Sequence, residues 1–176
     1  YLLLNHPEQL QLLHANPRLI KQAWFESLRH SPAVLAAKRF SRHEVERFGQ
    51  LLPEGAMVIC SAAAANRDPE IFTDAEHFLV GRKDLCQREP RGMYRADGLP
   101  AGIALGLGKP SKYPAIPEDR PISLYALTRN AVVEVSNMIL EQLTNLRLTN
   151  TADSSLRSLR LGDMRTCWDL PAEFDN

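Results

Sequence analysis

The spacing of apolar side chains predicts two substantial helices. Between Arg18 and His30 the apolar positions recur every three or four residues, at Leu19, Ile20, Ala23, Trp24 and Leu28. Between Leu124 and Leu146 a similar stripe contains Val132, Val135, Ile139, Leu140 and Leu143. A shorter helical segment, Leu10 to His14, precedes the first helix. It stops near Asn16-Pro17, because proline disfavours a helical conformation in the residue before it.

Short extended segments are predicted between these helices. The stretch from Val34 to Phe48 is less helical, and the alternating RFSRHEVERFG, residues 39–49, ends in glycine and indicates a hairpin. Leu52 to Gly55 is typical of a turn, and Met57 to Cys60 of a short strand. Ala62 to Ala65 predict a short helix, since alanine has the highest helix propensity. The following Asn66-Arg67-Asp68-Pro69 ends that helix.

Together these segments predict a single domain of mainly α class with small β-sheets (α+β), for which 176 residues can form a core. Its successive parts are helices over 1–32, a hairpin and short helix over 33–72, an irregular region over 73–123, the long helix over 124–146 and a β-rich tail over 147–176. The apolar start, Tyr1 to Leu4, and the missing initiator methionine favour a chain that continues upstream or was trimmed.

The composition argues against several classes of function. With 21 basic and 21 acidic residues the net charge is zero, which gives no indication of a nucleic-acid partner. No apolar run reaches the roughly eighteen residues of a membrane span. Cys60, Cys86 and Cys167 form neither a disulfide framework nor a zinc pattern, which favours a reducing, cytoplasmic location. No GxSxG, P-loop or HExxH motif occurs, and no two carboxylates have a spacing that indicates general acid–base catalysis.

Several segments, taken in order, resemble the C-terminal half of the cytochrome P-450 family of haem-thiolate monooxygenases. Glu26-Ser27-Leu28-Arg29 matches the ExxR motif, which is weak alone. LPEGAMVICSAAAANRDPEIF is similar to the family's PxGxxV…AANRDPxxF, and this spacing is specific. ALTRNAVVEVSNMILEQLTNLRL resembles the long helix that follows the ligand cysteine. The resemblance spans roughly Asn5 to Phe174 and implies that 73–123 contains the family's meander and cysteine loop.

The resemblance implies structural roles for several charged residues. Glu26 and Arg29 lie one helical turn apart and would form a buried ion network that supports folding rather than chemistry. The third place in that network falls at His77, with Arg82 as the alternative. Arg39, in RFSRHEVE, would contact a haem propionate, the alternative being an exposed strand arginine. Arg67 and Asp68 would fix the neighbouring backbone.

The cysteine that ligates the haem iron in this family has no counterpart in the predicted loop. ALGLG resembles the start of the ligand loop, with Gly106 and Gly108 as its glycines. Counting forward from this segment places the ligand at Lys112, and counting back from the long helix places it at Ile122. The counts differ by ten positions, which indicates an insertion, and no cysteine lies between Cys86 and Cys167.

The altered loop leaves few other candidates for a haem ligand. Pro110 stands where a histidine often precedes the cysteine, and the insertion KPSKYPAIPEDRP forms a stiff, proline-rich segment. Tyr113 and Tyr125 are alternatives because tyrosinate can ligate haem, although Tyr125 also fits a packing position at the start of the long helix. Cys86 lies early, within the meander-like stretch.

Three functions follow as hypotheses. The first is a degenerate, non-catalytic cytochrome P-450-like protein that acts as a scaffold or auxiliary partner and uses residues 109–121 as a contact surface. The second is a haem-dependent oxidoreductase with unusual ligation, completed by an N-terminal half and served by an electron-donor protein. The third is a binder of hydrophobic ligands in the vacated haem pocket.

Overall fold

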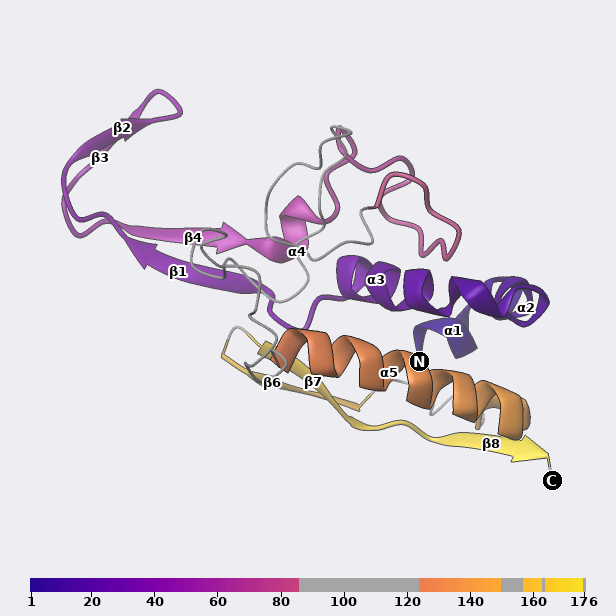
Figure 1. The fold of residues 1–176 in the computed structure, drawn as a ribbon. Coiled ribbons are helices and arrows are strands. Elements are labelled where there is room, and N and C mark those ends of the chain that lie inside the picture. The colour runs from indigo at the N-terminus through magenta and orange to yellow at the C-terminus, as the bar shows by residue number, and fades with distance from the viewer. Residues whose placement is uncertain (86–123, 150–156, 163, 176) are drawn as a thin grey trace, which may run out of the picture.

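The computed structural model describes residues 1–85, 124–149, 157–162 and 164–175 (Figure 1). The helices in these ranges are α1 (Leu2–Asn5), α2 (Pro7–Ala15), the 3-10 helix η1 (Pro17–Leu19), α3 (Ile20–His30), α4 (Ala62–Ala65) and α5 (Leu124–Gln142). The strands are β1 (Ala36–Phe40), β2 (Val45–Arg47), β3 (Gln50–Leu52), β4 (Met57–Ser61), β5 (Thr144–Leu148), β6 (Arg157–Leu161), β7 (Met164–Asp169) and β8 (Ala172–Asp175). The described residues therefore mix helices with small sheets, as predicted, and none of the described helices meets the length and apolarity that a bilayer crossing requires.

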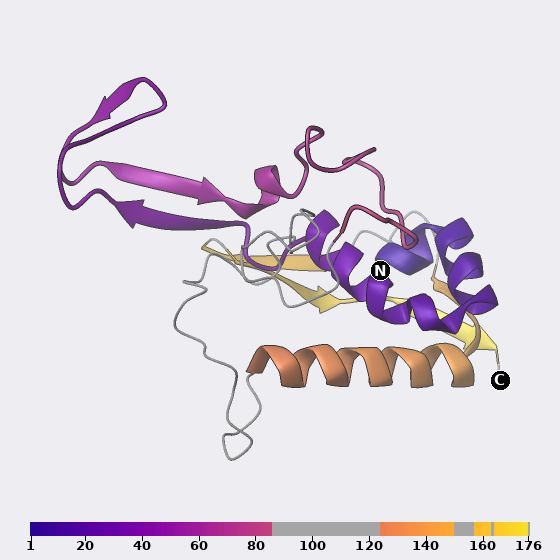
Figure 2. The same ribbon diagram turned by 45° about the horizontal axis from the view of Figure 1, so that its top comes forward.

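The first four strands form an arm that extends away from the helices (Figures 1 and 2). β1 pairs antiparallel with β4, and the β2–β3 hairpin lies at the far end. Phe48 and Gly49 connect β2 to β3 with φ values of 54° and 70°. Positive φ at both central positions is typical of the tight turns that match the twist of a hairpin. The predicted hairpin, turn and strand are confirmed.

Helix α4 and the residues that follow it form a fixed corner. The Ser61 Oγ accepts a hydrogen bond from the Ala64 amide at 3.1 Å and so caps the start of the alanine helix. At the other end, the Asp68 carboxylate accepts a hydrogen bond from the Glu70 amide at 2.9 Å. The Asp68 carbonyl accepts a further one from the Phe72 amide at 2.9 Å. The predicted alanine helix and its stop are both present.

The long helix is shorter than the sequence predicts. It ends at Gln142 rather than Leu146, because the next residues leave the helix to form β5, which pairs with β8. Asn145 takes a left-handed φ of 54°, which a helix interior does not adopt. A hydrogen bond from Asn145 and another from Arg147 lower the pKa of the Asp175 carboxyl, since both stabilise its charged form.

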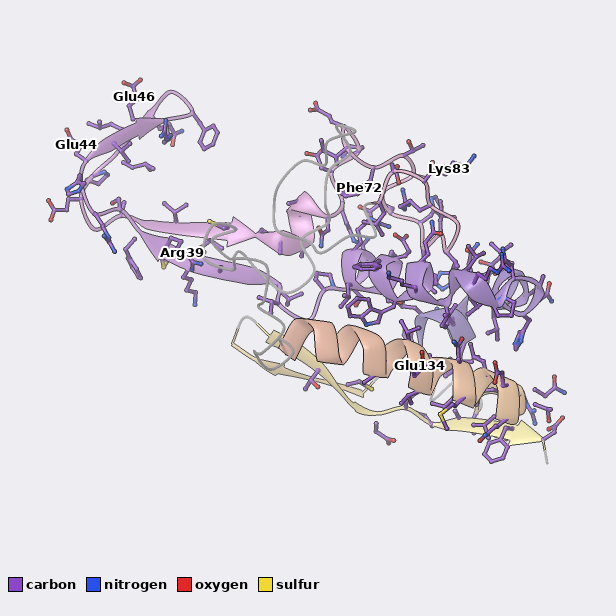
Figure 3. The ribbon with its side chains drawn as sticks, viewed as in Figure 1. Arg39, Glu44, Glu46, Phe72, Lys83 and Glu134 are labelled. Atoms are coloured by element: carbon purple, nitrogen blue, oxygen red, sulfur yellow. The ribbon has the colours of Figure 1, made fainter. Side chains whose placement is uncertain are left out.

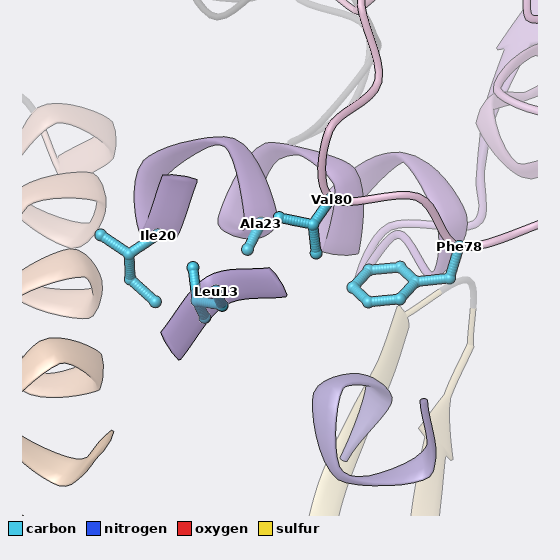
Figure 4. Packing of buried hydrophobic residues seen from close by; sticks show 5 residues of the cluster. All are labelled: Leu13, Ile20, Ala23, Phe78 and Val80. Atoms are coloured by element: carbon cyan, nitrogen blue, oxygen red, sulfur yellow. The ribbon is translucent and has the colours of Figure 1, made fainter. Parts of the chain in front are cut away.

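The main hydrophobic core lies where α2, α3 and residues 78–80 meet. Figure 4 shows its buried members, which are Leu13, Ile20, Ala23, Phe78 and Val80. Helix α5 contributes Val133 and Leu140 at the edge of this core. The predicted stripe on α5 is therefore wrong in part, because Val135 and Ile139 remain 53% and 40% exposed. Helix α5 presents a second apolar face that no described residue covers.

A second buried cluster joins the other side of α3 to the irregular segment. It contains Phe25, Phe72, Ala75 and Leu85, with Trp24 packed against it. Residues 73–85 form turns and bends without a helix or strand, so side chains on both flanks hold this segment to α3.

Truncating Phe78 tests the first core. We expect Phe78→Ala to lower the free energy of unfolding by about 3–5 kcal/mol, since a buried aromatic ring would leave a cavity. Urea denaturation followed by tryptophan fluorescence measures this loss. The control is Phe48→Ala, in a fully exposed turn, which should change stability by less than about 0.5 kcal/mol. Equal losses in the two variants would contradict the assignment of Phe78 to the core.

Candidate functional site

The best-defined polar site is a buried ion cluster on α3. Glu26 and Arg29 are 0% and 1% exposed. The Arg29 Nε donates to Glu26 Oε2 at 2.7 Å, and Arg29 Nη2 donates to Glu26 Oε1 at 2.8 Å. This bidentate pairing is the strongest common geometry of an arginine–carboxylate pair. Helical spacing of three residues places both side chains on the same face, as the sequence predicts.

The remaining donors of Arg29 reach two other segments of the chain. Its Nη1 donates to the Asn66 carbonyl at 2.7 Å and to the Ala75 carbonyl at 2.8 Å, and its Nη2 donates to the His77 carbonyl at 2.9 Å. All five N–H groups of the guanidinium therefore have acceptors. The Phe72 ring also covers the guanidinium, with its centroid 5.4 Å from Cζ. Arg29 thus fastens the corner after α4 and the irregular segment to α3.

Arg82 is the third charged member of the cluster. Its Nε lies 3.2 Å from Glu26 Oε2, and its Nη1 lies 3.3 Å from the Asp84 carboxylate. It also donates to the main-chain carbonyls of Thr73, Asp74 and His77. Two carboxylates therefore balance the two guanidinium groups, which is a condition for keeping such charges out of water.

The placement of the third network residue at His77 needs correction. The His77 side chain is exposed, and the residue contributes only its main-chain carbonyl, which accepts from both Arg29 and Arg82. Arg82, the alternative in the sequence analysis, fills the place. A guanidinium can donate to Glu26, to Asp84 and to carbonyls at once, whereas an imidazole has at most two N–H donors.

Within the described residues, this cluster has little capacity for chemistry. Glu26 also accepts the Leu79 amide at 3.0 Å, so both of its oxygens are used by protein donors. A satisfied buried network of this kind stabilises one conformation. Among the described residues, no group of three or more His, Cys, Asp and Glu side chains is placed to hold a metal ion.

The structure places Arg67 and His30 together beside this cluster. The Arg67 Nη2 donates to the His30 carbonyl at 2.9 Å, and Arg67 Nη1 pairs with the Glu76 carboxylate. Arg67 thereby fixes backbone at the end of α3, whereas the sequence predicted that it would fix the neighbouring backbone of its own corner. His30 was missed. Its position directly after the ExxR motif gives no signal, since the partners of its ring come from segments distant in sequence.

Arg39 lies on β1, in the arm (Figure 3). Its side chain is exposed, and its Nη1 donates to the Lys38 carbonyl at 2.8 Å. The contact with a haem propionate stays a prediction.

The predicted ligand loop lies outside the described residues. This applies to Cys86, Gly106, Gly108, Lys112, Tyr113 and Ile122. Tyr125 belongs to the first turns of α5, where only the backbone is described. The other two cysteines lie on strands: Cys60 is half-buried on β4, and Cys167 is exposed on β7.

Removing the central carboxylate tests whether the cluster holds the fold. We expect Glu26→Gln to lower the free energy of unfolding by about 3–5 kcal/mol, because Arg29 and Arg82 would stay buried without their shared counter-ion. Urea denaturation measures the loss. The control is Glu173→Gln, which removes an exposed partner of Arg147 and should leave the midpoint nearly unchanged. An unchanged midpoint in Glu26→Gln would mean that the cluster does not stabilise the fold.

Known proteins resemble this chain in sequence and in fold. A family model described as cytochrome P-450 matches residues 14–84. Protein DesVIII of Streptomyces venezuelae is 43% identical over 95 residues, covering 52% of this chain and 24% of that protein. Pulcherriminic acid synthase of Bacillus subtilis (strain 168) is 31% identical over 149 residues, covering 84% and 33%. The crystal structure of CYP105P1 in complex with filipin I matches with a TM-score of 0.75 and 23% identity, covering 99% of this chain and 38% of that one.

These matches cover between 24% and 38% of the length of those proteins, so the chain corresponds to a part of theirs. The buried ion cluster, the strand arm and the corner after α4 all lie inside the range of the family model. This chain belongs to the cytochrome P-450 family.

Proposed function

We propose that this chain is an auxiliary member of the cytochrome P-450 family, which keeps the family's scaffold and supports a partner protein without haem-thiolate chemistry of its own. The observation that carries the proposal is the absence of any cysteine from residue 87 to residue 166. The family's chemistry depends on a cysteine thiolate bound to the haem iron, which favours cleavage of the O–O bond. The predicted ligand positions hold Lys112 and Ile122 instead.

The described cysteines do not fit this role either. Cys60 is part of the β1–β4 ladder, opposite Ala37, and Cys167 is paired with Ser158 between β7 and β6. Neither residue lies in the segment that precedes α5, where the family resemblance requires the ligand. The two described cysteines therefore do not fit a thiolate-ligated haem.

A scaffold without chemistry of its own needs a contact surface, and two exposed apolar faces support that role. The register of β1 and β4 places Phe40 opposite Met57, with Ile59 next to them on the same face, and all three are exposed. On α5, Val135, Met138 and Ile139 form the other face. Contiguous exposed apolar surface marks interaction sites more often than chance. We propose these faces, together with residues 109–121, as the surface that contacts the partner.

The second candidate is a haem-dependent oxidoreductase with unusual ligation, completed by the rest of a cytochrome P-450 fold. The buried ion cluster supports it, because this chain retains the network although it spans only part of its relatives' length. In that case Tyr113, Tyr125 or Cys86 would hold the iron, and an electron-donor protein would be needed.

Absorption spectroscopy separates the two candidates. The full-length protein is produced with a haem precursor in the medium, purified, reduced and exposed to carbon monoxide, and its iron is quantified. For the auxiliary role we expect no Soret band and no stoichiometric iron. A Soret band that moves far to the red under carbon monoxide would show thiolate ligation and refute the proposal. A haem band without that shift would support the second candidate.

Two cysteine variants serve as controls for the register of the loop. Lys112→Cys and Ile122→Cys each place a thiol at one of the two predicted ligand positions. If neither gains a haem band, the pocket has been lost along with its ligand. A band gained by only one variant would identify the ligand position and show that the pocket itself survives.

A further inference from the structure

The imidazole of His30 lies where three segments meet. It is the last residue of α3, and its ring packs edge-on against Phe78, with the centroids 5.8 Å apart and the planes at 74°. Its Nε2 lies 3.2 Å from the Glu76 carbonyl, in the irregular segment. The Arg67 Nη2, from the corner after α4, lies 3.5 Å from the same nitrogen.

These contacts form a closed cycle. The His30 ring bonds to the main chain of Glu76, the Glu76 carboxylate pairs with Arg67, and Arg67 donates to the main-chain carbonyl of His30. The two segments that the cycle joins to α3 also supply the Asn66, Ala75 and His77 carbonyls to Arg29. Glu76 stands between two of these acceptors in sequence. The cycle therefore joins the same three segments as the buried ion cluster.

The contact with Glu76 sets which ring nitrogen of His30 carries the proton. The Glu76 carbonyl can only accept, at 3.2 Å, whereas the Arg67 guanidinium, at 3.5 Å from the same nitrogen, can only donate. We assign the proton to Nε2 from the shorter of the two contacts, which leaves the lone pair on Nδ1. Nδ1 is buried and has no hydrogen-bond partner within the described structure. A second proton would therefore create a buried N–H without an acceptor and a cation beside the Arg67 guanidinium.

We propose that His30, Arg67 and Glu76 form an acid-sensitive latch, which holds residues 73–85 against the end of α3 while His30 is neutral and releases them when it is protonated. The latch is independent of the proposed function, since it needs neither a haem nor a partner protein.

The charges around His30 also favour its neutral form, in which the latch is closed. Burial, and after it the charge of Arg67, lowers the pKa of His30 below its usual value of 6.5, and Arg29 acts in the same sense. The Glu76 carbonyl and the charge of Glu26 oppose this shift but do not cancel it. The closed latch therefore binds the proton less readily than the open one. Its stability is complete above about pH 6.5 and falls as the pH drops from there towards the native pKa.

Opening should be local to the irregular segment. In the closed form the His77 amide donates to the Asp74 carbonyl at 2.9 Å, and the Leu79 amide donates to Glu26 at 3.0 Å. The first bond lies within the released segment, and the second joins that segment to α3. The Ser41 amide, bonded to the Ala56 carbonyl at 3.0 Å on the arm, lies outside it and serves as an internal reference.

The test is a pH series of imidazole NMR and amide hydrogen exchange on the 176-residue chain. We expect His30 to titrate below the usual imidazole value of 6.5. After correction for intrinsic exchange rates, the protection of His77 and Leu79 should fall by up to about tenfold per pH unit across the window, because one proton is taken up on opening. The protection of Ser41 should stay constant.

Three variants separate the latch from general acid instability. His30→Gln keeps an N–H donor for the Glu76 carbonyl but does not titrate, so the pH dependence at His77 and Leu79 should disappear. Arg67→Gln should raise the pKa of His30, since it removes the neighbouring cation. His14→Gln, on the exposed side of α2, should leave the pH dependence intact.

Several outcomes would overturn the proposal. They are a His30 that titrates at or above 6.5, protection that falls equally at Ser41, and a pH dependence that persists in His30→Gln. If a variant fails to fold, the titration and exchange of the unsubstituted chain still decide the question.

Discussion

The described structure depends most on one buried carboxylate. Glu26 offers two oxygens in a space that water does not reach, and Arg29, Arg82 and the Leu79 amide use both of them. A buried charge without partners is costly enough to unfold a domain of this size. Helix α3 and residues 73–85 supply these donors, and the corner after α4 adds the Asn66 carbonyl to Arg29, so one carboxylate ties the three segments together.

This dependence explains how residues 73–85 keep a defined path without a helix or a strand. The backbone of such a segment finds few partners within itself, so other groups must satisfy it. Arg29 and Arg82 take four of its carbonyls, while Phe78 and Val80 on one flank and Ala75 and Leu85 on the other enter the two hydrophobic clusters. Electrostatic and apolar contacts thus replace the hydrogen-bond ladder of regular structure.

The ion cluster and the chemistry of the family are separable in this chain. All five donors of Arg29 are taken by protein groups, so the folding of this region does not draw on a bound haem. A sequence that loses the ligand cysteine can therefore keep the scaffold.

The sequence by itself determined the local elements and the family. Helical spacing found α3, proline and glycine marked the turns, and the ExxR and AANRDPE segments carried the resemblance, because each of these signals lies within a few neighbouring residues. The sequence did not predict the features that depend on contacts between segments distant in the chain. Strand pairing with β8 ended α5 early, packing left Val135 exposed, and the demand for several donors selected Arg82 over His77. Only the tertiary structure placed His30 among Arg67, Glu76 and Phe78, since a side chain's surroundings are set by segments that the sequence does not place beside it.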